Sequence, residues 1–234
     1  MASQKKGLLV TKVIAFSLWG DWEKYTIGAI RNAEIASNIY PDWVCRYYVG
    51  RDVPEDILNQ LQAMPNTQIC PMLAESNWNG MFWRFFAADS DDVMVSRDVD
   101  SRLSLREKAA VDEWLDGDKD FHIMRDHPYH ATEIMGGMWG VRNGLLRGIT
   151  DMITNYDKGE LDNKHQVDQT FLKDKIWPLV KDKAHINDEW FAKIPFPPSA
   201  PAWTELNFVG NAFNEYDKVI TDEEFIREKK RRNI

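Results

Sequence analysis

Paired aspartates are the residues of this 234-residue chain best suited to bind a hard metal ion. The spacing Asp-x-Asp occurs at Asp89/Asp91, Asp98/Asp100, Asp116/Asp118 and Asp118/Asp120. Only Asp98 and Asp100 follow a predicted strand, at residues 93–95, and ligands of open α/β sheets bind outside the carboxyl ends of strands. Because alternate residues of an extended segment project to one side, we expect these two carboxylates to bind one Mn²⁺ or Mg²⁺ ion.

An ion held by Asp98 and Asp100 would bridge the two phosphates of a nucleoside diphosphate and stabilise negative charge on a leaving group. Arg97 and Arg102 flank the pair. They would either hold phosphate or sugar hydroxyls or simply neutralise two crowded carboxylates. For the aspartates themselves, the alternative is an acidic turn without a ligand.

A second cluster is rich in glycine and reads Gly136-Gly137-Met138-Trp139-Gly140. Glycine lets the backbone approach a ligand closely, and Trp139 can offer an aromatic face to a pyranose ring. A tight turn that enters a strand is the alternative. Upstream, His127 and His130 flank a proline that disfavours a helix presenting both to zinc, so we expect them only to form hydrogen bonds.

The elements that must position these residues alternate between strand and helix. Strands are predicted at residues 13–16, 43–49, 67–70, 93–95, 121–124 and 138–141. Helices are predicted at residues 22–40, 54–64, 81–88, 104–115, 145–156 and 167–177, and the proline-rich residues 194–201 are predicted to be extended. This order predicts one α/β domain over residues 1–234, with a mainly parallel sheet covered by helices on both faces.

The composition excludes several classes of protein. With 29 basic and 37 acidic residues the net charge is -8, which argues against nucleic acid as a partner. Two cysteines cannot build a disulfide framework or a thiolate zinc site. Thr11 and Lys12 interrupt the apolar stretch near the N-terminus, so no secretory signal is predicted, and no apolar run is long enough to span a membrane. We therefore expect a cytoplasmic protein.

The C-terminal residues 222–234 form a basic tail, which has five basic residues and one acidic residue from Arg227 onward. One interpretation is a frayed, solvated helix end. The other is weak peripheral contact with an anionic membrane.

Three motifs together resemble those of the GT-A glycosyltransferases: Arg97-Asp98-Val99-Asp100, the glycine-rich residues 136–140 and Asp168-Gln169. In its small size and in the sequence of residues 124–142, the chain is similar to the small glycosyltransferase domains of large chlorella-type viruses. This resemblance covers most of residues 11–210. It implies a GT-A fold and sugar transfer from a nucleoside diphosphate sugar, at the family level a UDP-sugar. The acceptor would be a hydroxyl of a glycan or glycoprotein, and the location the host cytoplasm if the protein is viral.

The resemblance also implies roles for individual residues. The nucleotide base and ribose would rest on Phe16, Ser17, Leu18 and Trp19. Arg84 would meet the nucleotide, while Gly137 and Trp139 would shape the donor-sugar pocket. Asp98 and Asp100 would bind the metal, with His185 as a third ligand supplied by a C-terminal loop. The alternative for His185 is a surface histidine without a ligand.

The resemblance places Asp168 near the reacting sugar. An inverting enzyme needs a base that deprotonates the acceptor, and Asp168 or Asp126 is the candidate. A retaining enzyme needs a nucleophile near the anomeric carbon or attack guided by the leaving phosphate. The similarity to the viral domains favours retention.

Three other classes of protein share parts of this pattern. A sugar-phosphate nucleotidyltransferase has the same sheet and metal, but its first strand would lead into a glycine-rich, basic loop, unlike residues 17–21. A phosphatase of the haloacid dehalogenase type places its Asp-x-Asp after the first strand, whereas here the pair follows the fourth predicted strand. A carbohydrate-binding or viral structural protein would use the ten tryptophans and bind sugar without metal.

Overall fold

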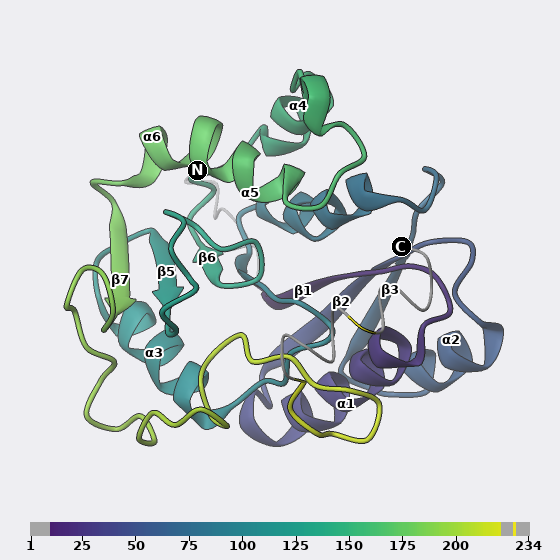
Figure 1. Ribbon diagram of the computed structural model, residues 1–234, viewed down its shortest axis with the longest axis horizontal. Coiled ribbons are helices and arrows are strands. Elements are labelled where there is room, and N and C mark those ends of the chain that lie inside the picture. Colours follow the sequence, from purple (N-terminus) through teal and green to yellow (C-terminus); the bar gives the residue numbers. More distant parts are fainter. Residues whose placement is uncertain (1–9, 221–226, 228–234) are drawn as a thin grey trace, which may run out of the picture.

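A seven-stranded sheet forms the centre of the molecule (Figure 1), whose computed structural model describes residues 10–220 and Arg227. The strand order is β3-β2-β1-β4-β6-β5-β7. The strands are β1 (Lys12–Leu18), β2 (Trp43–Val49), β3 (Thr67–Pro71), β4 (Val93–Ser96), β5 (Phe121–Arg125), β6 (Trp139–Val141) and β7 (Ala184–Asp188). All paired strands are parallel except that β6 runs antiparallel to β4 and β5. The predicted mainly parallel sheet is thus confirmed.

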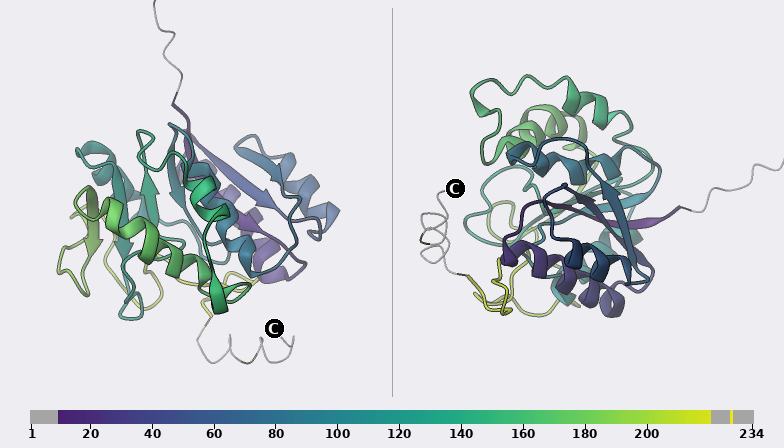
Figure 2. Two further views of the ribbon diagram at one scale, coloured as in Figure 1. Left: turned by 90° about the horizontal axis from the view of Figure 1, so that it is seen from above. Right: turned by 90° about the vertical axis from the view of Figure 1, so that its right-hand side faces the viewer.

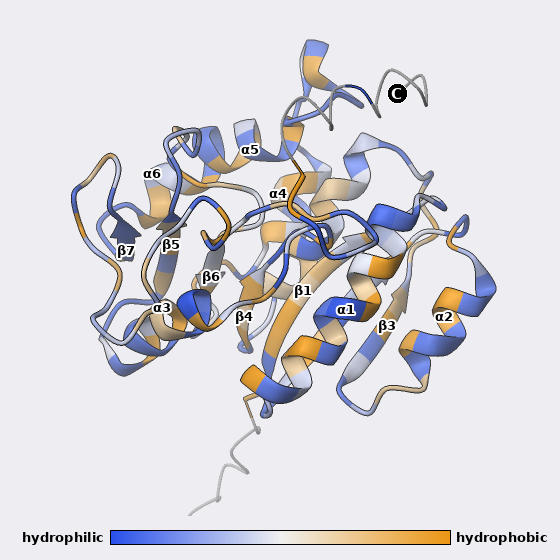
Figure 3. Ribbon diagram, turned by 60° about the horizontal axis from the view of Figure 1, so that its bottom comes forward, coloured by the Kyte–Doolittle hydropathy of each residue, from blue (hydrophilic) through white to orange (hydrophobic). Residues whose placement is uncertain are grey.

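Three helices cover one face of the sheet: α1 (Glu23–Ile39), α2 (Glu55–Gln62) and α3 (Leu105–Asp116). Successive side chains of a strand point to opposite faces. Ile14 and Phe16 of β1 accordingly pack with these helices, whereas Val13 and Ala15 belong to the core on the other face. In Figure 3 the ribbons of α1 and α2 carry both hydrophobic and hydrophilic stretches, as expected of helices with one buried side.

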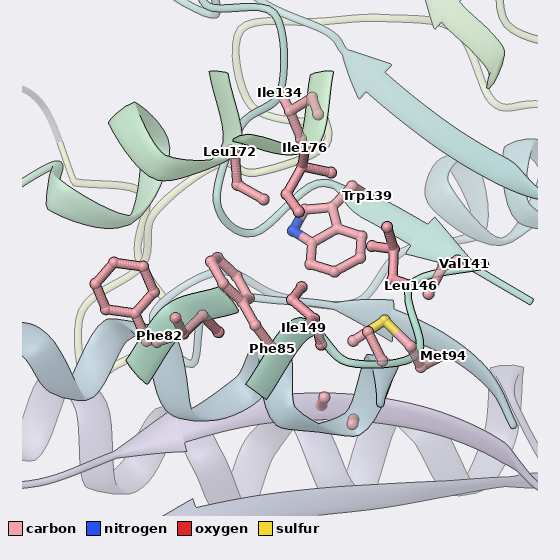
Figure 4. Close-up of a cluster of buried hydrophobic side chains, with 14 of the residues drawn as sticks. Phe82, Phe85, Met94, Ile134, Trp139, Val141, Leu146, Ile149, Leu172 and Ile176 are labelled. Atoms are coloured by element: carbon pink, nitrogen blue, oxygen red, sulfur yellow. The ribbon is translucent and has the colours of Figure 1, made fainter. Parts of the chain in front are cut away.

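The other face is covered by short helical segments, so the sheet has helices on both sides, as predicted (right-hand view of Figure 2). These segments are η1 (Trp78–Ala88), α4 (Ile149–Thr154), η2 (Gly159–Leu161), α5 (Val167–Phe171), η3 (Leu172–Ile176) and α6 (Trp177–Val180). Their apolar side chains enclose Trp139 of β6, which Figure 4 shows near Phe85 and Ile176. This core supports one wall of the candidate site described below.

Some elements differ from the sequence-based expectation. The predicted helix at residues 81–88 is a 3₁₀ helix that begins earlier, at Trp78, where the Asn77 side chain accepts a hydrogen bond from the Asn79 backbone. The helix predicted at residues 145–156 begins only at Ile149, because Gly148 has a left-handed backbone with φ 91°. Strand β7 was not predicted, since the sequence AHIND lacks an apolar pattern.

The remaining expectations concern the ends and the surface of the molecule. Residues 194–201 contain no helix, as predicted, although Phe196 is buried against the guanidinium of Arg106. Apart from Arg227, the basic tail at residues 222–234 lies outside the described part of the chain. Within that part, every helix is too short or too polar to cross a lipid bilayer.

Candidate functional site

A cavity of about 530 Å³ lies where β1 and β4 end. Residues from β1, η1, α5 and the loops after β4 and before β6 contribute to its wall. Among its lining residues are Ser17, Leu18, Trp19, Tyr25, Trp78, Arg84, Asp98, Asp100, Gly136, His165, Asp168 and Gln169. A more open hollow of about 680 Å³ lies between the ends of α1 and α2 but contains no buried charged cluster. We therefore place the candidate site in the smaller cavity.

Asp98 and Asp100 both line this cavity, but they lie in a turn and not in the extended segment that we expected. The turn forms because the backbone N–H and the hydroxyl of Ser101 both donate to the carbonyl of Asp98, at 3.3 and 2.8 Å. From the C-terminal part of the chain, the Phe213 N–H donates to the carbonyl of Asp100 at 2.8 Å. The two side chains remain partly accessible, with 45% and 20% of their surface exposed.

Arg84 of η1 connects Asp98 to Asp168 of α5. Its guanidinium pairs with Asp98 through Nη1 and lies 3.0 Å from Asp168 through Nη2. Burial acts to lower the pKa of Arg84, but the two carboxylates outweigh it and raise that pKa. Burial raises the pKa of Asp168, against the influence of Arg84. The second carboxylate oxygen of Asp168 is buried and makes no hydrogen bond of good geometry with the described residues, although the neighbouring Gln169 backbone acts to lower the pKa of Asp168.

The glycine pair before β6 is required by this acidic cluster. A Cβ on Gly136 would lie 2.5 Å from Asp168 Oδ2 and 2.7 Å from Arg84 Nη2. A Cβ on Gly137 would collide with the carboxylate of Asp98. The Ser96 hydroxyl donates to the Gly136 carbonyl at 2.8 Å and so ties this loop to β4. The glycines thus let the backbone pass directly beside the three charged side chains.

One side of α1 holds in place the turn from Asp98 to Ser101, called the carboxylate turn below. Lys24, Gly28 and Asn32 are spaced by four residues and therefore share a helix face. The Asn32 amide donates to the carbonyls of Val99 and Ser101, at 3.1 and 2.9 Å, and its oxygen accepts the Leu103 N–H at 3.0 Å. A side chain at Gly28 would collide with the Val99 carbonyl. One turn earlier, Lys24 Nζ lies 2.6 Å from Asp100 Oδ2.

Four residues predicted to contact the donor do not line the cavity: Phe16, Arg97, Gly137 and Trp139. Phe16 is fully buried on the opposite face of β1, where its ring stacks on Tyr47 at 4.9 Å. Arg97 is 1% exposed, and its Nε lies 2.9 Å from Glu107 Oε1 in the core. Its Nη1 also donates to the Ser96 carbonyl at 2.7 Å. Arg97 therefore braces the start of the carboxylate turn and is not available to bind phosphate.

Trp139 does not present its ring to a sugar. It is fully buried between Phe85 and Phe121, with ring centroids 5.3 and 5.4 Å away (Figure 4 labels Trp139 and Phe85). Both faces of the sheet are covered at β6, so a central strand residue has no route to the surface. Gly137, two residues earlier, lies directly beside the Asp98 carboxylate but is not among the residues that line the cavity, so its predicted role at the donor sugar stays a prediction.

His185 does not lie with the metal-binding pair. It belongs to β7, at the far edge of the sheet from β3, and its Nε2 lies 3.1 Å from Glu113 of α3. Asp126 is also outside the cavity. Both of its carboxylate oxygens accept from Arg106, at 2.7 and 2.8 Å, and one also accepts the Val209 N–H at 2.9 Å. Neither residue is positioned for the role expected of it.

Several cavity residues escaped the sequence-based prediction. Tyr25 lines the cavity, and Lys24 does not line it but pairs with Asp100, which does. Both lie in the first turn of the helix after β1, a position that can be deduced from the strand–helix order. Trp78 and His165 face each other at 5.1 Å between ring centroids, and Asn163 Oδ1 accepts the Trp78 N–H at 2.9 Å. These contacts join the start of η1 to the loop between η2 and α5, far away in the sequence, and no local motif marks either segment.

The residues of the cavity fit a divalent cation that a diphosphate also coordinates. Asp98 and Asp100 each have one oxygen paired with a basic side chain, and no described residue binds the other oxygen. Among the described residues, no group of three or more His, Cys, Asp and Glu side chains is arranged to hold a metal. Mg²⁺ is commonly held by one or two carboxylates, with phosphates and water completing the shell, which is the arrangement this pair allows.

Comparison with known proteins identifies the fold. The chain matches no protein-family model, and no curated protein matches it in sequence. A glycosyltransferase involved in glycosylation of the major capsid of PBCV-1 aligns with a TM-score of 0.50 and 13% identity, covering 76% of this chain and 82% of the other. Glucosyl-3-phosphoglycerate synthase of M. tuberculosis aligns with a TM-score of 0.50 and 14% identity, covering 76% and 70%.

A third solved structure belongs to a different class of enzyme. The 4-diphosphocytidyl-2C-methyl-D-erythritol synthase of Anaerococcus prevotii aligns with a TM-score of 0.50 and 10% identity, covering 96% of this chain and 99% of the other. Similarities at this level of identity establish the fold that the chains share. The chain has the GT-A fold of the glycosyltransferases that its motifs resemble.

Proposed function

We propose that this protein is a glycosyltransferase that moves a sugar from a nucleoside diphosphate sugar, a UDP-sugar, to a hydroxyl of a glycan or glycoprotein. The observation that carries the proposal is the convergence of Asp98, Asp100, Arg84 and Asp168 on one cavity at the carboxyl ends of β1 and β4. These side chains come from three separate elements, so their meeting is a property of the fold and not of one acidic loop.

The nucleotide would occupy the part of the cavity nearest β1. Ser17, Leu18 and Trp19 line it there, and Tyr25 adds a second aromatic ring. Aromatic rings bind bases by stacking. The Ser17 hydroxyl accepts a hydrogen bond from the backbone N–H of Arg84 at 3.0 Å. The end of β1, which would receive the nucleotide, therefore also positions Arg84, the residue that links Asp98 to Asp168.

Asp98 and Asp100 would hold a Mn²⁺ or Mg²⁺ ion through the two oxygens that have no partner among the described residues. When bound, such an ion would stabilise negative charge on the departing diphosphate. The chain itself fixes both carboxylates through Arg84 and Lys24, so little reorganisation is needed when the donor binds.

Asp168 is the residue that we place at the donor sugar. Its Oδ2 is held by Arg84, and its Oδ1 is buried at the cavity wall without a partner. A carboxylate in this position can accept a hydrogen bond from a sugar hydroxyl or receive the proton of the acceptor. We propose retention of configuration, on the resemblance to the small viral domains. Proton NMR of the first-formed product would show the anomeric configuration directly.

A nucleotidyltransferase is the second candidate, because the diphosphocytidyl-methylerythritol synthase shares the fold over 96% of this chain. Residues 17–21 (Ser-Leu-Trp-Gly-Asp) have one glycine and no basic residue, which disfavours binding of a nucleoside triphosphate there. Incubation with CTP or UTP and a sugar phosphate would release pyrophosphate only if this second candidate is correct.

Thermal unfolding with Mn²⁺ and UDP tests the proposal. At a hundredfold excess of ligand over Kd, binding adds about 2.7 kcal/mol, which raises Tm by roughly 5–10 °C in a protein of this size. The Asp100→Ala variant should lose this rise. Asp112→Ala is the matched control, since Asp112 pairs with Lys108 on α3 outside the cavity. Absence of any UDP effect in the unaltered protein, with or without Mn²⁺, would contradict the proposal.

A further inference from the structure

Lys24 is the one buried lysine in the described part of the chain. Its side chain is 2% exposed, and Nζ lies 2.6 Å from Oδ2 of Asp100. The ammonium also lies 5.5 Å from the ring centroid of Trp22 and 4.9 Å from that of Tyr25. Lysine is almost never fully buried unless it is paired. The chain has therefore placed a fixed positive charge against one of the two carboxylates that we propose to bind metal.

The position of Lys24 is set by the packing of α1. Gly28 permits contact with the Val99 carbonyl, and Asn32 holds the carbonyls of Val99 and Ser101. Lys24 lies on the same helix face, one turn before Gly28. Its ammonium is consequently held against Asp100 by backbone contacts of the helix, and not by the Asp100 carboxylate alone.

A fixed ammonium has opposite effects on the two ligands of the site. Among the described residues, three carboxylates, Asp98, Asp100 and Asp168, are paired with two cations, Arg84 and Lys24, so these five side chains together carry one negative charge. A positive charge this close repels a divalent cation at the free oxygen of Asp100 and attracts a diphosphate in the cavity. Such interactions are strong where side chains are shielded from water.

We infer that Lys24 is a positioning residue that lowers the affinity of Asp100 for a divalent cation and raises the affinity of the cavity for the nucleoside diphosphate. The inference rests on the proposed function, because it assumes that both ligands bind in this cavity. It adds a property that the proposed function lacks: Lys24 weakens binding of the free metal and strengthens binding of the diphosphate, so that the metal is retained mainly together with the diphosphate.

The test is to measure two affinities in the full-length chain, that for Mn²⁺ alone and that for UDP in the presence of EDTA. Lys24→Met keeps the length and apolar stem of the side chain but removes the charge. We expect this variant to bind Mn²⁺ at least tenfold more tightly and UDP at least tenfold more weakly. A purely structural role for Lys24 would move both affinities in the same direction, towards weaker binding.

Three further variants complete the experiment. Lys24→Arg keeps the charge and should restore both affinities to within about threefold of the original values. Lys24→Gln provides a neutral hydrogen-bond donor to Asp100 and should show the same two shifts if the Met variant unfolds. Lys173→Met is the matched control, because Lys173 is 57% exposed and pairs with Glu133 outside the cavity.

The outcomes separate the two proposals. Opposite shifts that Lys24→Arg reverses would support the inference. If the unaltered protein binds Mn²⁺ and UDP but the neutral variants change neither affinity, or weaken both, the inference is wrong and the proposed function stands. If the unaltered protein binds neither Mn²⁺ nor UDP, the proposed function and the inference fail together.

Discussion

Two arginine–carboxylate clusters lie beyond the ends of strands in this protein, and they have opposite characters. In one, Arg84 holds Asp98 and Asp168 at the wall of the cavity, and an oxygen of Asp168 has no partner. In the other, Arg106 binds both oxygens of Asp126, and the Val209 N–H binds one of them again. The first is the open cluster, because one oxygen of Asp168 is left without a hydrogen bond among the described residues. The second is the saturated cluster, because both oxygens of Asp126 accept hydrogen bonds.

The comparison explains why Asp126 and Asp168 were equal candidates in the sequence but not in the structure. Both are acidic residues near predicted strands or helices, and both are buried. They differ in how many of their hydrogen-bonding positions the chain itself fills, which depends on residues far away in sequence. Buried carboxylates that the chain saturates contribute to folding, and those it leaves incomplete are available for chemistry.

The largest effect on the free energy of unfolding should come from breaking the saturated cluster of Arg106 and Asp126. Asp126→Ala leaves the guanidinium of Arg106 in the interior with fewer acceptors, and the loss of one partner of a buried pair costs about 3–5 kcal/mol. Urea unfolding should show this decrease in the free energy of unfolding. Asp116→Ala, at the exposed end of α3, should change it by less than about 0.5 kcal/mol. A loss of UDP binding in folded Asp126→Ala would contradict the division between the clusters.

A change in the open cluster of Arg84, Asp98 and Asp168 should reduce activity far more than stability. In Asp168→Asn the amide oxygen can still accept from Arg84, so we expect a change in unfolding free energy of no more than about 1 kcal/mol. Sugar transfer should fall at least about a hundredfold, or about 2.7 kcal/mol in the activation free energy. The measurements are kcat with a UDP-sugar and urea unfolding of the same preparation.

The control for Asp168→Asn is Asp174→Asn, which lies on the exposed side of η3. Equal kcat values for the two variants would show that Asp168 has no part in the reaction. A large loss of stability in Asp168→Asn would instead mean that the two clusters are alike.

The effect expected to be smallest over any single pH unit concerns His130, which belongs to the saturated cluster because its Nδ1 accepts the Asp126 N–H at 3.1 Å. Burial lowers the pKa of His130 to about 4. Between pH 6.5 and pH 4 the unfolded chain therefore takes up a proton at this residue while the folded chain does not. The folded state should lose up to about 1.4 kcal/mol per pH unit through His130 as the pH falls.

The His130→Gln variant isolates this contribution. The unaltered protein should have its greatest advantage in unfolding free energy over the variant near pH 7, and the advantage should shrink toward pH 4. Urea unfolding at a series of pH values measures the difference. An advantage that stays constant over this range would show that His130 titrates alike in the folded and unfolded chains.

The sequence predicted most of the sheet and the placement of its main acidic residues. Strands with apolar runs, such as β1 and β4, were recognisable, and the rule that ligands bind at carboxyl ends selected Asp98 and Asp100 from four similar pairs. Both residues, together with Arg84 and Asp168, line the cavity. Their roles in binding and catalysis stay predictions.

The failures of prediction have a common physical cause. Whether the side chains of Trp139 and Arg97 reach the cavity depends on which elements cover their strand on each side. The sequence of one segment does not reveal this. His185 was assigned to a C-terminal loop on the resemblance, whereas it lies in β7, whose sequence has no apolar pattern, and its partner is Glu113 of α3. Lys24 was missed because its importance depends on how α1 packs on the carboxylate turn.

The contact between Phe213 and Asp100 has a consequence for the order in which the protein matures. The carboxylate turn is held by a backbone hydrogen bond from a residue more than a hundred positions later in the chain. During translation the ribosome delivers that residue long after the first strands have emerged. The nascent polypeptide thus cannot complete the hydrogen bonding of this turn, which lines the cavity, until nearly all of the described chain has been synthesised.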